Sequence, residues 1–197
     1  MLKFPIYLAT QNQHKVVELL SLMGEQFSVK SLTDLSFSDE IPETGDTLSQ
    51  NSLQKAKFIA ERFKVCCLAD DSGLEVEALG GQPGVFSARY AGIPKNDQAN
   101  LEKLLENMQG LENRKARFVT VLTYHLDGAY YQFEGSVDGQ ITHSAIGDKG
   151  FGYDPIFVPE NQTKTFAEMN LPEKNIFAHR AKALKKFINF VDETFKC

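Results

Sequence analysis

The amino-acid sequence predicts an α/β fold in which a mixed β-sheet is flanked by helices. Two observations predict this class. At the front of the chain, strand-like segments alternate with segments of helical periodicity, as in sheets whose parallel strands are joined by helices. In the middle, a long β-prone stretch surrounds an Asp-Gly pair, which indicates antiparallel strands joined by a tight turn. A sheet with both kinds of pairing is mixed.

The first sixty residues predict two strands and two helices. We expect a strand at residues 3–10 and a helix over 12–25 with Asn12 at its N-cap, followed by a short strand at 27–32. After an irregular acidic stretch, residues 45–63 predict a second helix. Its apolar face is formed at helical spacing by Leu48, Ser52, Ala56, Ile59 and Phe63.

The next segment, residues 65–70 (VCCLAD), predicts a buried strand. We expect Ser72 and Gly73 to break it, because serine and glycine favour turns. Residues 73–79 then alternate, and the glycines and proline of residues 80–84 (GGQPG) predict a turn.

The second half of the chain predicts one helix before and one helix after an antiparallel meander. Residues 96–110 form an amphipathic pattern that closes with Gly110 at the C′ position. Residues 116–146 predict the meander, with Asp127-Gly128 as its hairpin turn, and the last helix is expected over 172–195.

Composition bounds the class of protein. The 197 residues are 42% hydrophobic and 24% charged, which predicts one globular domain, residues 1–197. With no apolar run long enough to span a membrane and no signal-peptide pattern, we expect a cytoplasmic location and no membrane partner. The net charge of -5 argues against a nucleic-acid polymer as partner, and the three cysteines show no zinc or disulfide spacing.

Residues 10–15 (TQNQHK) lie where the first strand passes into the first helix. A helix N-terminus offers unpaired N–H groups and a partial positive charge, so Thr10, Asn12 and the next amides could hold a phosphate that Lys15 neutralises. The alternative is that Asn12 only caps the helix. On this segment alone, capping is the better interpretation.

Two acidic segments could serve a metal ion. Glu43 precedes the second helix, on which Asn51 and Lys55 share a face. Asp70 and Asp71 follow a buried strand, where two carboxylates are costly unless they are paired or bind a cation. Mg²⁺ suits them, since it accepts one or two carboxylates together with substrate phosphates. The alternatives are a solvated surface for the first segment and a turn cap for the second.

Two later segments carry candidate binding residues. In residues 147–157, glycines alternate with Phe151 and Tyr153, and exposed aromatics in such a loop could stack on a base. Aromatics that fold back into the core are the alternative. Lys174, His179 and Arg180 then supply clustered donors on the last helix, although a lone histidine there is usually structural or solvated.

Together these segments resemble the inosine triphosphate pyrophosphatase family, which hydrolyses non-standard purine nucleoside triphosphates. The resemblance spans nearly the whole chain in the family's order. It is carried by Thr10-x-Asn12-x-x-Lys15, Glu43-Thr44-Gly45, Asn51 with Lys55, residues 69–92 (ADDSGLEVEALGGQPGVFSARYAG), 150–157 (GFGYDPIF) and 173–184 (EKNIFAHRAKAL).

The resemblance implies an elongated mixed sheet in two lobes with the active-site cleft between them, and a homodimer. It also implies cleavage of ITP, dITP or XTP between the α and β phosphates with Mg²⁺ as cofactor. Asp71 is then the catalytic base, and Glu43, Asp70 and Asp71 serve the metal. The implied substrate-binding residues are Thr10, Asn12, Lys15, Lys55, Ser72, Phe151, Gly152, Tyr153, Asp154, Lys174, His179 and Arg180.

The sequence departs from the family's pattern at four positions. Gln11 stands where the family usually has glycine, Gln50 and Ser52 where it reads glutamate and alanine, and Ala178 where serine precedes the His-Arg pair. Two alternatives stay open. One is a non-catalytic purine-nucleotide-binding or regulatory protein, and the other is the same cleavage on pyrimidine or modified nucleotides.

Overall fold

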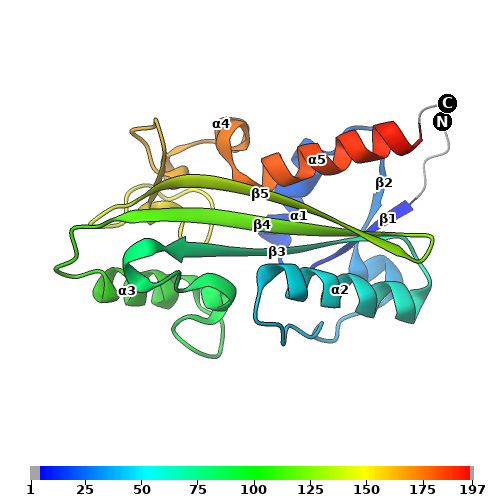
Figure 1. Cartoon of the computed structure of the whole chain (residues 1–197), viewed down its shortest axis with the longest axis horizontal. Coiled ribbons are helices and arrows are strands. Elements are labelled where there is room, and N and C mark those ends of the chain that lie inside the picture. Colours follow the sequence, from blue (N-terminus) through cyan, green and yellow to red (C-terminus); the bar gives the residue numbers. More distant parts are fainter. Residues whose placement is uncertain (1–4, 196–197) are drawn as a thin grey trace. The chain divides into compact units, whose positions relative to one another are not determined.

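The computed structural model describes residues 5–195, which fall into two compact units (Figure 1). Each unit is assembled from separate stretches of the chain. The first contains the described residues up to Asp71, Thr120–Gly135 and those from Arg180 on, and the second contains Ser72–Val119 and Ser136–His179. The expectation of a single domain over residues 1–197 stays a prediction.

The strands form a six-stranded sheet in the order β2-β1-β3-β4-β5-β6. β1 pairs in parallel with β2 and β3, while β5 and β6 pair antiparallel, so the predicted mixed sheet is confirmed. The strands are β1 (Pro5–Ala9), β2 (Ser28–Lys30), β3 (Cys67–Val76), β4 (Lys115–Leu126), β5 (Ala129–Ile141) and β6 (Phe157–Pro159).

Three helices cover the strands of the first unit: α1 (Gln13–Leu22), α2 (Leu48–Phe63) and α5 (His179–Thr194). Figure 1 shows α2 and α5 on either side of β3 and β4. Because side chains alternate along a strand, Leu68 packs in one core cluster with Leu19 and Phe187, whereas Cys67 and Ala69 pack in another with α2. The first unit therefore buries both faces of its strands.

The Asp-Gly signal is confirmed as the hairpin turn between β4 and β5. Asp127 and Gly128 have φ values of 48° and 84°, and they are the only two residues between the strands. Positive φ at both central positions is typical of a type I′ turn, whose twist matches that of the two flanking strands. Glycine favours this turn because it adopts positive φ without steric cost.

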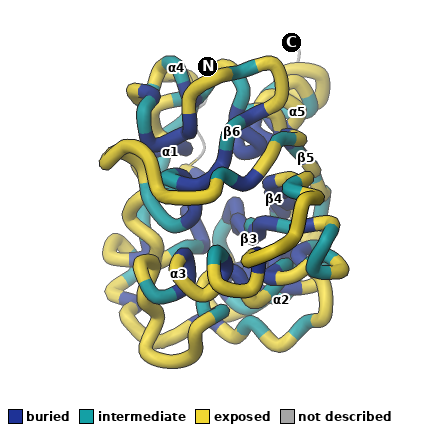
Figure 2. The backbone as a smooth tube through the Cα atoms, turned by 90° about the vertical axis from the view of Figure 1, so that its left-hand side faces the viewer, coloured by how far each residue is buried: buried dark blue, intermediate teal, exposed yellow. Residues whose placement is uncertain are grey.

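The second unit contains α3 (Asp97–Asn107), α4 (Leu171–Phe177) and an aromatic core. Phe118 packs edge-on against Phe157 with ring centroids 4.7 Å apart, and Phe157 lies 5.4 Å from Phe166. The backbone of β3 and β4 is mostly buried, and many of the connecting loops are exposed (Figure 2). No helix within residues 5–195 is long and apolar enough to cross a membrane.

Two predicted boundaries are wrong, and tertiary contacts explain both. β3 continues through Ser72 and Gly73 instead of ending there, because Gly73 lets the backbone of Gly84 approach closely: a Cβ at position 73 would lie 2.4 Å from the Gly84 carbonyl oxygen. The last helix is broken at Ala178, which is extended and ends α4. Lys174 before the break pairs within the second unit, and Arg180 after it pairs within the first.

The end of α3 differs by one position from the prediction. Its C-cap is Met108, so Gly110 lies at C″ and not at C′. Gly110 has a φ of 73°, the left-handed conformation in which glycine carries no steric cost.

We expect Gly73→Ala to destabilise the protein by roughly 1–3 kcal/mol, because the new methyl group must push β3 away from Gly84. Urea unfolding monitored by circular dichroism measures this loss. Gly110→Ala is the control, since a Cβ there meets nothing and only the left-handed backbone is penalised, by about 1–2 kcal/mol. An unchanged midpoint for Gly73→Ala would contradict the close-approach argument.

Candidate active site

Asp70 and Asp71 lie side by side in the middle of β3, and successive side chains of a strand point to opposite faces. Each carboxylate is buried, with 0% of Asp70 and 7% of Asp71 exposed. The two acids therefore belong to different contact groups, both within the first unit. This arrangement replaces the turn cap that was one interpretation of the sequence.

Asp71 shares one lysine with Glu43. The Lys55 Nζ lies 2.7 Å from the Asp71 Oδ1 and 2.7 Å from the Glu43 Oε1. Burial alone would lower the pKa of Lys55, but the two carboxylates raise it above its ordinary value. Burial raises the pKa of Asp71, and Lys55 opposes that shift. The ammonium group of Lys55 therefore lies between two carboxylates.

Asp70 joins a second ion-pair group. Its Oδ1 lies 2.5 Å from the Lys15 Nζ, and its Oδ2 accepts a hydrogen bond from the Arg180 Nε at 2.7 Å. Arg180 also pairs with the buried Glu18 of α1. Burial by itself would raise the pKa of Asp70, but Arg180 and Lys15 hold it well below its usual range.

The helix start at residues 10–15 shows the predicted cap. The Asn12 Oδ1 accepts hydrogen bonds from the backbone of His14 and Lys15 at 3.0 and 3.3 Å, and the Asn12 N–H donates to the Thr10 Oγ1 at 3.2 Å. Burial lowers the pKa of Lys15, with Asp70 working in the opposite direction. The ion pair between Lys15 and Asp70 connects the start of α1 to β3.

A divalent cation fits the Glu43 and Asp71 group better than the Asp70 group. Glu43 and Asp71 are two carboxylates that share Lys55 as a cationic partner, and oxygen ligands are what Mg²⁺ prefers. Both oxygens of Asp70 contact cationic side chains, and its role as a metal ligand stays a prediction. Within residues 5–195 no three His, Cys, Asp or Glu side chains form a metal-holding group.

In the second unit, Asp154 organises the glycine loop. Its Oδ2 accepts hydrogen bonds from the backbone of Phe151 at 2.9 Å and from the Lys174 Nζ at 2.5 Å, and all but 2% of Asp154 is buried. The Lys174 ammonium lies 5.1 Å from the centre of the Phe151 ring. Gly152 donates a backbone hydrogen bond to the Asp97 Oδ2 at 3.0 Å.

Two aromatic predictions are now resolved. Tyr153 is buried, and its hydroxyl donates to the Ser87 carbonyl oxygen at 2.9 Å, so it belongs to the core and is not an exposed stacking platform. Phe157 is also buried, whereas Phe151 is half-buried. His179 stacks on Phe118 with ring centroids 4.8 Å apart.

The predicted donor cluster is divided between the units. Lys174 and His179 belong to the second unit, but Arg180 belongs to the first, where it pairs with Asp70. Ser72 is half-buried on β3. Glu18 on α1 was not predicted, because a single carboxylate on a helix gives no signal before its partner Arg180 is known.

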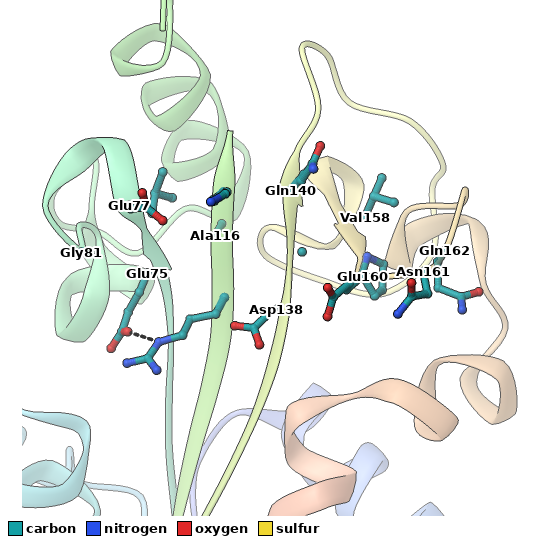
Figure 3. A pocket seen from close by; sticks show the side chains of 15 residues that line it. Glu75, Glu77, Gly81, Ala116, Asp138, Gln140, Val158, Glu160, Asn161 and Gln162 are labelled. Carbon is teal, nitrogen blue, oxygen red and sulfur yellow. Dashed lines mark hydrogen bonds and ion pairs between the residues drawn. The ribbon is translucent and has the colours of Figure 1, made fainter. Parts of the chain in front are cut away.

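A pocket of about 580 Å³ in the second unit contains none of the predicted site residues (Figure 3). Residues of β3, β4, β5 and β6 line it, and Glu75 pairs there with Arg117 at 2.7 Å. Its lining has mixed charge and is largely exposed. The buried ion pairs of the first unit are therefore a more distinctive candidate site than this pocket.

The fold and site define a mixed-sheet α/β protein that buries paired carboxylates and cationic side chains in its first unit. Residues 6–190 match the model of the Ham1 family, so the chain belongs to that family. This finding confirms the resemblance drawn from the sequence.

Relatives and solved structures agree with this assignment. The chain is 45% identical to the dITP/XTP pyrophosphatase of Flavobacterium johnsoniae over 94% of this chain and 97% of the relative, and 44% identical to that of Bacillus subtilis over 94% and 96%. The structure of the Staphylococcus aureus Ham1 protein superposes with a TM-score of 0.88 at 36% identity, covering 96% of this chain and 99% of that one.

We expect Asp70→Asn to destabilise the protein by about 3–5 kcal/mol, because it leaves the buried Arg180 facing a neutral amide. Thermal or urea unfolding measures the loss. Asp138→Asn, at an exposed position on β5, is the matched control and should change stability by less than about 0.5 kcal/mol. Equal stabilities of the two variants would show that the Asp70 pairs contribute little.

Proposed function

We propose that this chain is a Mg²⁺-dependent hydrolase that cleaves ITP, dITP and XTP between the α and β phosphates, releasing a nucleoside monophosphate and pyrophosphate. The observation that carries the proposal is the ion-pair group in which the buried Asp71 and Lys55 join the half-buried Glu43. Membership of the Ham1 family and relatives named dITP/XTP pyrophosphatase support the substrate class.

In this proposal the first unit handles the phosphates. Phosphoryl transfer depends mainly on positioning and on neutralising the charge of the transition state. Lys15 and Lys55 supply positive charge, and Thr10 and Asn12 add polar groups at the start of α1. Asp71 orients a water molecule and accepts its proton as the water attacks.

Glu43 and Asp71 are the residues that would hold Mg²⁺. When bound, the ion supplies Lewis-acid polarisation of the phosphate oxygens. Lys55 contacts both carboxylates, so it keeps them together and neutralises part of their repulsion. Asp70 has a different role in the proposal: it holds Lys15 and Arg180 in place.

The second unit supplies the proposed base-recognition residues. Lys174 and His179 are donors suited to the 6-oxo group of hypoxanthine or xanthine, whereas adenine carries an amino group there. A buried site built to hydrogen-bond one group can reject its mismatch by about 10⁴-fold. Phe151, beside Lys174, offers an aromatic face, while Gly152 and Asp154 shape the loop.

The first test identifies the products. With ITP and Mg²⁺, purified protein should release one pyrophosphate per nucleoside monophosphate, scored by a pyrophosphate-coupled assay and by chromatography. A panel with dITP, XTP, GTP, ATP and pyrimidine nucleotides at equal concentration ranks the substrates. Orthophosphate without pyrophosphate would refute the reaction, and saturable ITP binding without any product would favour the binding-protein alternative.

The second test removes the proposed base. We expect Asp71→Asn to lower kcat by at least about 10²-fold, because an amide cannot accept the proton of the attacking water. Circular dichroism should show an intact fold, and Asp138→Asn should keep the wild-type rate. Wild-type turnover by Asp71→Asn would remove Asp71 from the mechanism. The cytoplasmic location, the homodimer and the active-site cleft stay predictions.

A further inference from the structure

The segment that carries Glu43 has no regular secondary structure of its own. We call residues 38–46 the Glu43 loop; they lie between a short 3₁₀ helix, Leu32–Leu35, and the start of α2. A loop without a hydrogen-bonded ladder needs other groups to fix its backbone. The position of the Glu43 carboxylate therefore depends on what binds this loop.

Side-chain amides of α2 bind the second half of the loop. Three successive backbone N–H groups donate to three amide oxygens: Thr44 to the Gln54 Oε1 at 2.9 Å, Gly45 to the Asn51 Oδ1 at 2.7 Å, and Asp46 to the Gln50 Oε1 at 2.7 Å. The Gln54 Nε2 also donates to the Thr44 Oγ1 at 2.9 Å. Gln54 thus contacts both the backbone and the side chain of the residue next to Glu43.

The loop also packs tightly on α2. A Cβ added at Gly45 would lie 2.7 Å from the Gln50 Cβ and 3.0 Å from the Asn51 Oδ1. Only glycine permits this approach, and the approach brings the Gly45 N–H within reach of the buried Asn51. Packing and hydrogen bonding therefore specify the same loop position.

A fourth amide binds the first half of the loop. The Gln11 Nε2 donates to the carbonyl oxygens of Ser38 and Asp39 at 3.1 and 2.8 Å. Gln11 and Gln50 are two of the positions where the sequence departs from the pattern it resembles. Both side chains bind the Glu43 loop, so these departures have a structural role here.

The helix that binds the loop also carries Lys55, which pairs with Glu43 and follows Gln54 directly. We propose that Gln54, together with Gln50 and Asn51, is a positioning residue that sets the divalent-cation affinity of Glu43 and Asp71. The inference rests on the cation site of the proposed function. Neutral amides suit this role, because they fix the loop without adding charge beside the two carboxylates.

The experiment replaces Gln54 with methionine, which keeps the length of the side chain and removes its hydrogen bonds. Mn²⁺ serves as the probe, because it shares the oxygen preference of Mg²⁺ and is counted directly by electron paramagnetic resonance. We expect Gln54→Met to weaken Mn²⁺ binding by about 10–100-fold, measured with and without inorganic pyrophosphate. The KM for ITP at saturating metal should stay within a few-fold of wild type.

Two further variants separate positioning from general damage. Gln98→Met makes the same replacement on the exposed surface of α3, where the Gln98 Nε2 donates to the Glu102 Oε1 at 2.7 Å, and it should bind Mn²⁺ as wild type does. Gly45→Ala, which displaces the loop sterically, should reproduce the loss.

Wild-type Mn²⁺ affinity in Gln54→Met would overturn the inference, as would an equal loss in Gln98→Met or no Mn²⁺ binding by the wild-type protein. The proposed reaction fails separately. If wild-type protein released no pyrophosphate from ITP while Gln54→Met still lost Mn²⁺ affinity, the reaction would be wrong and the positioning role of Gln54 would stand.

Discussion

The structure of the first unit depends on placing two neighbouring carboxylates inside a buried strand. A buried charge without a partner costs several kcal/mol, so each aspartate requires cations on its own face of the sheet. Lys15 and Arg180 meet this requirement for Asp70, and Lys55 meets it for Asp71. Helices α1, α2 and α5 thereby contribute one cation each, and the ion pairs tie all three helices to β3.

Much of the fold follows from local sequence signals. The N-cap at Asn12 and the Asp127-Gly128 hairpin each have a local physical cause, and the structure confirms them. Contacts distant in sequence explain the errors. The approach of Gly84 to Gly73 and the division of polar partners around Ala178 appear only once the chain has folded.

The candidate site was predictable in its residue types but not in its pairing. Sequence spacing placed Asp70 and Asp71 together, since adjacency in the chain suggests a shared ligand. Strand geometry separates them, because adjacent side chains of a strand point to opposite faces. Glu18 and Gln54 were missed, as a single carboxylate or amide on a helix gives no signal until its partner is known.

The ion-pair groups on β3 also have a consequence for the order in which ligands arrive. Together they contain four carboxylates and three cations, so their formal charge is -1. The side chains are Glu18, Glu43, Asp70, Asp71, Lys15, Lys55 and Arg180. A polyphosphate that approaches this negative charge without a cation is repelled. A bound divalent cation would change the formal charge of the groups from -1 to +1. Under the proposed function, the electrostatics therefore favour nucleotide that arrives already complexed with its cation, or a cation that arrives first.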